Sequence, residues 1–125
     1  MKTEKIDGAT FETWSVEEVA KAWSDNEIVL IDVRTPQEYM FEHIEGALLL
    51  PMPFFNANAL PGQSDKRIVF HCGSGVRSEK VCREAVAAGI DRIAHMEGGF
   101  GAWKAAQMPY IGTNMATGAP QAVNA

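Results

Sequence analysis

The chain has 125 residues and a mass of 13.6 kDa, which is the size of a single domain. Hydrophobic residues make up 46% of it and charged residues 22%, which excludes a disordered, collagen-like or disulfide-stapled chain. The formal net charge is −5, the opposite of the basic balance that nucleic-acid-binding domains usually show, so we expect no nucleic-acid partner.

The first half of the chain alternates helix and strand signals. Residues 15–18 form a capping box, in which a serine and a glutamate satisfy each other's backbone N–H groups, and this predicts a helix to about residue 24. The apolar run 28–31 predicts a strand covered on both faces. A second capping box, with a proline directly after the cap, predicts a short helix over residues 35–41. Residues 47–50 predict another buried strand, and residues 54–65 form a connection.

The second half continues this alternation around a glycine-rich loop. Residues 67–71 predict a strand, which runs into a loop over residues 72–78 and then a helix that Gly89 ends. Residues 92–96 predict the last strand, and a pair of glycines leads into a final helix to about residue 106. Alternating strands and helices are typical of an α/β fold with helices on both faces of a parallel sheet. We expect a sheet of about five strands.

The end of the chain differs in composition from the rest. Its last 17 residues carry no charged side chain and are rich in Ala, Gly, Asn and Thr. We therefore expect the domain to occupy residues 1–108 and a flexible tail to occupy residues 109–125.

The sequence also bears on where the protein works. Residues 1–8 are charged and lack the apolar segment of a secretory signal. No apolar run approaches the roughly 20 residues that cross a bilayer. We expect a cytoplasmic location and no membrane partner, and in that reducing compartment the two cysteines, Cys72 and Cys82, are expected to remain thiols.

Cys72 stands at the carboxyl end of a predicted strand, where parallel sheets place their ligand sites. Gly73 and Gly75 allow the backbone to turn so that successive N–H groups point at one spot. The following helix adds a partial positive charge and Arg77 a full one, and both favour a thiolate. The alternative is a buried cysteine that acts as a small hydrophobe. The anion cradle around the sulfur favours a reactive Cys72.

The segment Cys72-Gly-Ser-Gly-Val-Arg77-Ser78 resembles the active-site loop of the rhodaneses, the thiosulfate sulfurtransferases. Residues 31–39, 43–47 and 97–103 resemble further signature segments of that family, in matching order and spacing. The resemblance implies a rhodanese-like three-layer fold. It also implies an enzyme that takes a sulfane sulfur from thiosulfate or a related donor as a persulfide on Cys72. The acceptor would be cyanide, a small thiol or a protein thiol.

The same resemblance assigns donor binding to the loop that follows the cysteine. Its backbone amides would stabilise the anionic persulfide. Arg77, the only cation inside the loop, is expected to bind the donor, and neither a metal nor an organic cofactor is implied. The loop residues so assigned are Gly73, Ser74, Gly75, Val76, Arg77 and Ser78.

Two other functions stay open at this point. Some phosphatases and arsenate reductases that resemble this fold place five residues between Cys and Arg, whereas four separate Cys72 from Arg77 here. The shorter ring suits a single added sulfur better than a tetrahedral phosphate. The other alternative is a non-catalytic rhodanese-like binding or sensing module, although such modules often lack the cysteine.

Several residues outside the loop are candidates for supporting it. Asp32 and Arg34, at the end of a predicted strand, either brace the loop or its arginine or form a buried ion pair. Gly98 and Gly99 are expected to let the backbone approach the loop closely. Ser78 either hydrogen-bonds within the loop or caps the helix.

Other polar residues are expected to be structural. Glu38 is explained by its capping box, and Cys82 by its place on the apolar face of a helix. His43, His71 and His95 lack the spacing of metal ligands. Strand alternation is expected to turn the His71 side chain away from that of the neighbouring cysteine.

Overall fold

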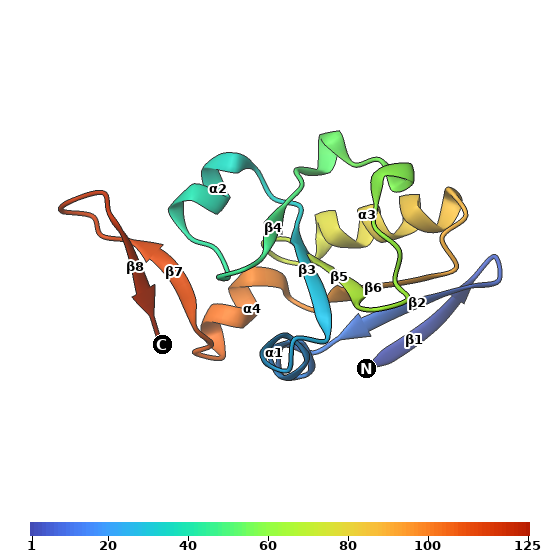
Figure 1. The fold of residues 1–125 in the computed structure, drawn as a ribbon, viewed down its shortest axis with the longest axis horizontal. Coiled ribbons are helices and arrows are strands. Elements are labelled where there is room, and N and C mark those ends of the chain that lie inside the picture. Colours follow the sequence, from blue (N-terminus) through green and yellow to red (C-terminus); the bar gives the residue numbers. More distant parts are fainter.

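The computed structural model describes all residues from 1 to 125, and a six-stranded sheet forms its centre (Figure 1). The strands are Lys2–Ile6 (β1), Ala9–Trp14 (β2), Ile28–Asp32 (β3), Leu48–Leu49 (β4), Arg67–His71 (β5) and Arg92–Met96 (β6). Their order is β1-β2-β6-β5-β3-β4, with β1 antiparallel to β2 and every other neighbouring pair parallel. The predicted parallel sheet is confirmed, and one antiparallel strand extends its edge.

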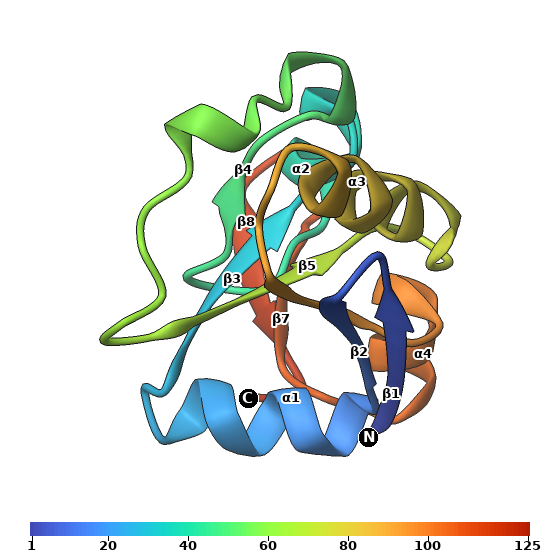
Figure 2. The same cartoon turned by 90° about the vertical axis from the view of Figure 1, so that its right-hand side faces the viewer.

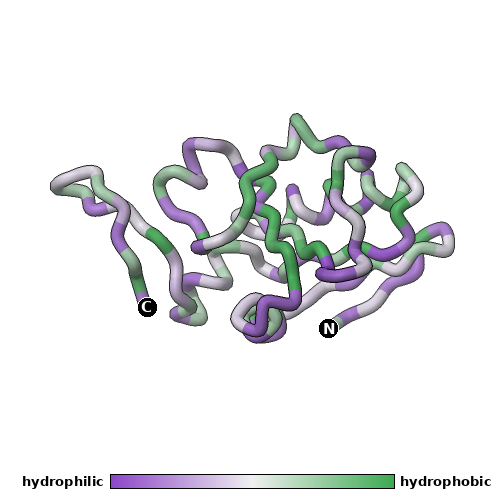
Figure 3. Tube along the Cα trace, in the orientation of Figure 1, coloured by the Kyte–Doolittle hydropathy of each residue, from purple (hydrophilic) through white to green (hydrophobic).

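Helices cover both faces of the sheet, so that the molecule has three layers (Figure 2). The α-helices are Val16–Ser24 (α1), Pro36–Phe41 (α2), Val76–Ala87 (α3) and Gly99–Ala105 (α4). One core cluster joins the sheet to α3 and includes Phe70 and Cys82. The other joins the sheet to α1 and α4 and includes Val19 and Trp103. Hydrophobic residues accordingly gather along the central strands (Figure 3).

The helix starts follow from the sequence in two cases and differ in a third. Both predicted capping boxes are present, one between Ser15 and Glu18 and one between Thr35 and Glu38. The helix after the cysteine begins earlier than predicted, because Gly75 serves as its N-cap with a left-handed φ of 106°. Val76, Arg77 and Ser78 therefore lie in the first turn of α3 rather than in a loop. None of the helices combines the length and apolar composition needed to cross a membrane.

The N-terminal hairpin of β1 and β2 was not predicted from the sequence. Asp7 and Gly8 join the two strands, with φ values of 50° and 86°. Two left-handed residues fit the tight turns that hairpins favour, and Asp-Gly is a strong signal for such a turn. Strand β2 then pairs with β6, which places the hairpin at the edge of the sheet.

The predicted buried strand over residues 47–50 is corrected by the structure. Strand β4 contains two residues and lies at the other edge of the sheet, where the Leu48 side chain is 58% exposed. An edge strand leaves one side open, and Pro51 follows almost at once. The connection that comes next contains two short 3-10 helices, Met52–Phe54 (η1) and Ala57–Ala59 (η2).

The structure also differs from the flexible tail predicted over residues 109–125. Tyr110–Thr113 (β7) and Pro120–Val123 (β8) form an antiparallel hairpin that projects from the body of the molecule (Figure 1). The hairpin is anchored at its base, where Ile111 bridges His43 and the Tyr110 ring packs edge-on against Phe100 at 5.4 Å. The amino-acid composition did not predict this hairpin, because its strands are short and their residues are mostly half-buried or exposed.

Candidate active site

The side chain of Cys72 is enclosed by the loop that follows β5. Its Sγ accepts the N–H of Gly75 at 3.0 Å and that of Ser78 at 3.4 Å. The cysteine is fully buried, and strand alternation turns it into the core cluster beneath α3. His71 turns the opposite way, toward Phe100 of the other cluster, as predicted. The arrangement aims backbone N–H groups at the sulfur.

The N-terminus of α4 holds the loop in this shape. The N–H of Phe100 donates to the Cys72 carbonyl at 2.7 Å, and the N–H of Gly101 donates to the Gly73 carbonyl at 3.0 Å. Between them, Gly99 lies so close that a Cβ there would stand 2.5 Å from the Cys72 oxygen. The Cys72 and Gly73 carbonyls thus bind α4, while the N–H groups of Gly75 and Ser78 bind the sulfur.

The two predicted supporting glycines therefore have different tasks. Gly99 permits the close approach of α4 to the loop. Gly98 is the N-cap of α4 with φ of 74°, and a Cβ there would stand 2.6 Å from the Cβ of Ala102 in its own helix. Gly98 also approaches the loop through its backbone nitrogen, 3.6 Å from where a Cβ on Gly75 would lie.

Hydrogen bonds to the sulfur lower the pKa of the Cys72 thiol by more than burial raises it. Burial alone raises its pKa, because it disfavours the charged form. The Ser78 N–H, the Ser78 hydroxyl and the N–H groups of Gly75 and Ser74 act in the opposite direction. The net pKa of Cys72 is below the ordinary value of a thiol. For Cys82, by contrast, burial in the core raises the pKa, which leaves an inert thiol.

Arg77 is held by Glu38, a partner that the sequence analysis did not assign. Arg77 Nη1 donates to Glu38 Oε1 at 2.7 Å and Nη2 to Oε2 at 3.0 Å. The Arg77 hydrogen bonds are the main cause that lowers the pKa of Glu38 to about 2. Glu38 thus closes its capping box on Thr35 and also fixes Arg77. The expectation that Glu38 acts in the capping box alone is corrected, and the charge of Arg77 is neutralised by its partner.

Asp32 and Arg34 pair with each other rather than with Arg77. Arg34 Nη2 donates to Asp32 Oδ2 at 2.7 Å, and both side chains are buried. The same Nη2 donates to the Glu42 carbonyl at 2.7 Å, and the guanidinium lies 4.6 Å above the Phe100 ring. Of the two alternatives, the geometry matches the buried ion pair. The pair reaches the loop only indirectly, since His71 Nε2 lies 3.7 Å from Asp32 Oδ2.

Ser78 and His95 form a contact at the sulfur that the sequence analysis missed. Ser78 Oγ lies 3.6 Å from Cys72 Sγ and 2.8 Å from His95 Nδ1. Since Gly75 is the N-cap of α3, Ser78 does not cap the helix but reaches the sulfur from the first helical turn. No local motif marks His95, which comes from β6 and enters the site because β6 lies next to β5.

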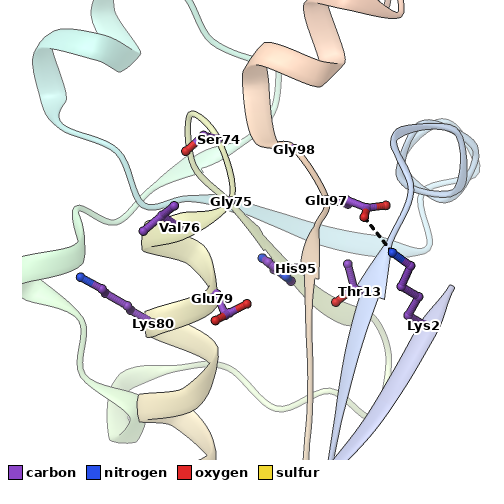
Figure 4. A pocket seen from close by; sticks show the side chains of 10 residues that line it. All are labelled: Lys2, Thr13, Ser74, Gly75, Val76, Glu79, Lys80, His95, Glu97 and Gly98. Atoms are coloured by element: carbon purple, nitrogen blue, oxygen red, sulfur yellow. Dashed lines mark hydrogen bonds and ion pairs between the residues drawn. The ribbon is translucent and has the colours of Figure 1, made fainter.

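Two surface cavities flank the loop. One, of about 420 Å³, is lined by residues from the loop, α3 and the N-terminal hairpin, with His95 among them (Figure 4). The other, of about 300 Å³, lies on the α2 and α4 side and is lined by Gly73, Arg34 and Glu38 among others. No group of three or more His, Cys, Asp or Glu side chains is placed to hold a metal ion.

The chain is similar in sequence to known proteins. The sequence profile described as "Rhodanese-like domain" matches residues 15–106. A sulfurtransferase of Allochromatium vinosum is 31% identical over 96 residues, which cover 76% of this chain and 90% of the relative. An uncharacterised protein of Synechocystis is 39% identical over 89 residues, and the match spans 71% of this chain but half of that longer protein.

Solved structures show the same fold. A rhodanese-like domain protein from Staphylococcus aureus has a TM-score of 0.64 and 30% identity, covering 74% of this chain and 90% of that one. A Rhodopseudomonas palustris protein described as a possible tyrosine phosphatase has a TM-score of 0.66 and 28% identity, covering 79% and 83%. Proteins with this fold therefore carry names from more than one reaction class.

Proposed function

The chain belongs to the rhodanese-like domain family, and from this premise we propose that it transfers a sulfane sulfur through a persulfide on Cys72. The observation that carries the proposal is the cradle of N–H groups around a thiol whose pKa is lowered. A thiolate is the nucleophilic form of cysteine, and preorganised amides stabilise negative charge on sulfur without reorganising during the reaction.

The first half-reaction loads the cysteine. The Cys72 thiolate attacks the outer sulfur of thiosulfate or a related donor, and a new S–S bond forms. The S–S bond of the donor breaks, and sulfite leaves with the electron pair. The persulfide would carry its negative charge on the outer sulfur, and the loop amides and the N-terminus of α3 beside Cys72 would stabilise that charge.

The second half-reaction removes the outer sulfur from the Cys72 persulfide. Cyanide or the thiolate of an acceptor attacks the outer sulfur, the bond to Cys72 breaks, and the cysteine returns as a thiolate. A small thiol or a protein thiol would serve as acceptor, and a reducing cytoplasm would keep both thiols available. Because Cys72 is fully buried, the reacting atom of donor or acceptor has to be slender, as sulfane sulfur and cyanide are. No cofactor takes part in either step.

The Arg77 contact favours sulfur transfer over phosphate hydrolysis. A phosphatase needs its loop arginine to bind phosphate oxygens in the fork geometry that guanidinium groups offer. Here both Nη atoms of Arg77 are occupied by the Glu38 carboxylate. A phosphate at the loop would meet a neutralised arginine and a nearby negative charge.

The intact Cys72, in turn, favours an enzyme over a non-catalytic module.

Steady-state kinetics test the proposal. Thiosulfate and cyanide should give thiocyanate, with parallel lines in double-reciprocal plots, as two-step covalent transfer requires. Cys72→Ser should abolish turnover, whereas Cys82→Ala should retain it, since Cys82 lies in the core. Hydrolysis of p-nitrophenyl phosphate by Cys72, without thiocyanate formation, would show that the protein is a phosphatase instead.

A further inference from the structure

The hydroxyl of Ser78 lies between the reactive sulfur and an imidazole ring. Ser78 Oγ is 3.6 Å from Cys72 Sγ on one side and 2.8 Å from His95 Nδ1 on the other. Its remaining neighbour, the Gly75 carbonyl, is more distant at 3.3 Å. A serine hydroxyl has one proton to donate and lone pairs to accept. The shortest contact shows that His95 is its principal partner.

His95 connects this hydroxyl to the surface. Its ring packs against Phe11 at 5.2 Å and is 5% exposed, and it lines the cavity of about 420 Å³ beside the loop (Figure 4). Burial lowers the pKa of His95, so that the ring is neutral at pH 7 and has a lone pair to offer. The charged groups that face it or share the cavity are Glu79, Lys80 and Arg83 of α3, Lys2 of β1, and Glu97 after β6.

We propose that His95 is a positioning residue that orients the Ser78 hydroxyl and holds the thiol proton while Cys72 acts as nucleophile. This inference rests on the proposed function and adds a proton route to it. In the resting state, the Cys72 S–H points to Ser78 Oγ, and the Ser78 O–H donates to the lone pair of His95 Nδ1.

The proton leaves Cys72 before the first half-reaction and returns to it after the second. As Cys72 becomes a thiolate, its proton passes to Ser78 Oγ and the serine proton passes to Nδ1. His95 is then a cation, and the negative charge formed on the sulfur offsets the cost of burying it. Its Nδ1–H donates to Ser78, and the serine O–H donates to the sulfur anion. When the acceptor removes the outer sulfur, the same proton returns along the same two contacts. No oxidant, reductant or further reactant is needed.

Alkylation of Cys72 tests this route without any sulfur donor. The rate with iodoacetamide is followed by intact mass from pH 5 to 10. Expressed relative to the plateau that each variant reaches at high pH, it reports the thiolate fraction independently of how easily the reagent enters. His95→Asn keeps a polar group near the Nδ1 position but cannot hold the proton, and His95→Phe keeps an aromatic ring against Phe11. His43→Asn is the matched histidine control, because His43 stacks on Tyr39 away from the loop. Circular dichroism confirms that each variant is folded.

We expect both His95 variants to raise the apparent pKa of Cys72, so that alkylation at pH 7 slows about five- to tenfold. Ser78→Ala should slow it as well, and adding His95→Asn to Ser78→Ala should then change nothing further, because the route is already interrupted. His43→Asn should alkylate as wild type. Identical pH profiles for wild type and both His95 variants would overturn the inference. A full His95 effect in the Ser78→Ala background would overturn it too.

The alkylation result is independent of the sulfur-transfer result. If the His95 variants shift the alkylation profile but wild type makes no thiocyanate, the proposed function fails and the proton route stands. If wild type makes thiocyanate while the His95 variants alkylate as wild type at every pH, the function stands and the proton route fails.

Discussion

Glu38 binds Arg77 with both carboxylate oxygens, at 2.7 Å and 3.0 Å, and thereby pairs the only cation between Cys72 and Ser78. Glu38 stands on α2 and Arg77 on α3, so the contact also fastens the first turns of two helices together. Stabilisation of an anion at Cys72 thus depends on backbone N–H groups more than on a free guanidinium.

Releasing Arg77 should improve the binding of an anionic donor. Glu38→Gln keeps an oxygen for the capping box but removes the negative charge. We expect the KM for thiosulfate to fall about two- to fivefold, which corresponds to the worth of one partly exposed charge. Asp25→Asn is the control, because it neutralises an acidic residue of a surface pair far from the loop. An unchanged or higher KM in Glu38→Gln would contradict a restraining role for Glu38.

The same pair should make stability depend on acid pH. The pKa of Glu38 in the folded protein, about 2, lies below the ordinary 4.5. Glu38 therefore stabilises the fold fully above about pH 4.5 and loses that contribution as the pH falls toward 2. Because both side chains are partly exposed, we expect about 1 kcal/mol at most. Urea unfolding at pH 7 and pH 3 measures it: the difference between wild type and Glu38→Gln should shrink at pH 3. A difference that is equal at both pH values would refute the assignment.

A methyl group at Gly99 should disable the loop. Gly99→Ala would place a Cβ 2.5 Å from the Cys72 carbonyl oxygen and 2.6 Å from the Gly73 carbonyl carbon, so α4 and the loop would have to separate. A displacement of about 1 Å at a catalytic group can cost roughly 100-fold in rate. We expect at least such a loss in thiocyanate formation.

Gly8→Ala is the matched control for this substitution. Gly8 also has a positive φ, 86° against 61° for Gly99, but nothing lies within 4 Å of its Cβ position. Both variants bear the backbone strain of a left-handed alanine, about 1 to 2 kcal/mol. Gly8→Ala should keep full activity. Equal activity in the two variants would show that the close approach of Gly99 does not shape the site.

Breaking the buried ion pair should cost stability. Arg34→Leu would leave Asp32 buried and without its main partner, and removal of one member of such a pair typically costs about 3 to 5 kcal/mol. Chemical denaturation measures the loss. Lys21→Ala removes one member of an exposed pair and should change stability little. A small effect in Arg34→Leu would mean that Asp32 is well satisfied by its remaining neighbours, against our interpretation.

Local signals in the sequence were sufficient for part of this structure. The capping boxes at Ser15 and Thr35 and the strand that leads to Cys72 depend on neighbouring residues, and all are present. Contacts between distant elements left no such signal. Glu38 and Arg77 are 39 residues apart, and Ser78 and His95 meet only because β6 packs beside β5.

Two of the missed features involve hairpins. The Asp7-Gly8 turn could have been found from its dipeptide, since apolar and polar residues alternate directly after it, from Ala9 to Glu12. The hairpin of β7 and β8 could not, because its strands bury little and its position depends on the bridge between Ile111 and His43. Edge elements with few core contacts are the ones that hydrophobic patterning identifies least.

The most direct measurement is the intact mass of the protein after incubation with thiosulfate. A persulfide on Cys72 predicts a gain of about 32 Da, reversed by cyanide with release of thiocyanate. The gain should persist in Cys82→Ala and vanish in Cys72→Ser. An unchanged mass in wild type, or the same gain in Cys72→Ser, would contradict sulfur transfer through Cys72.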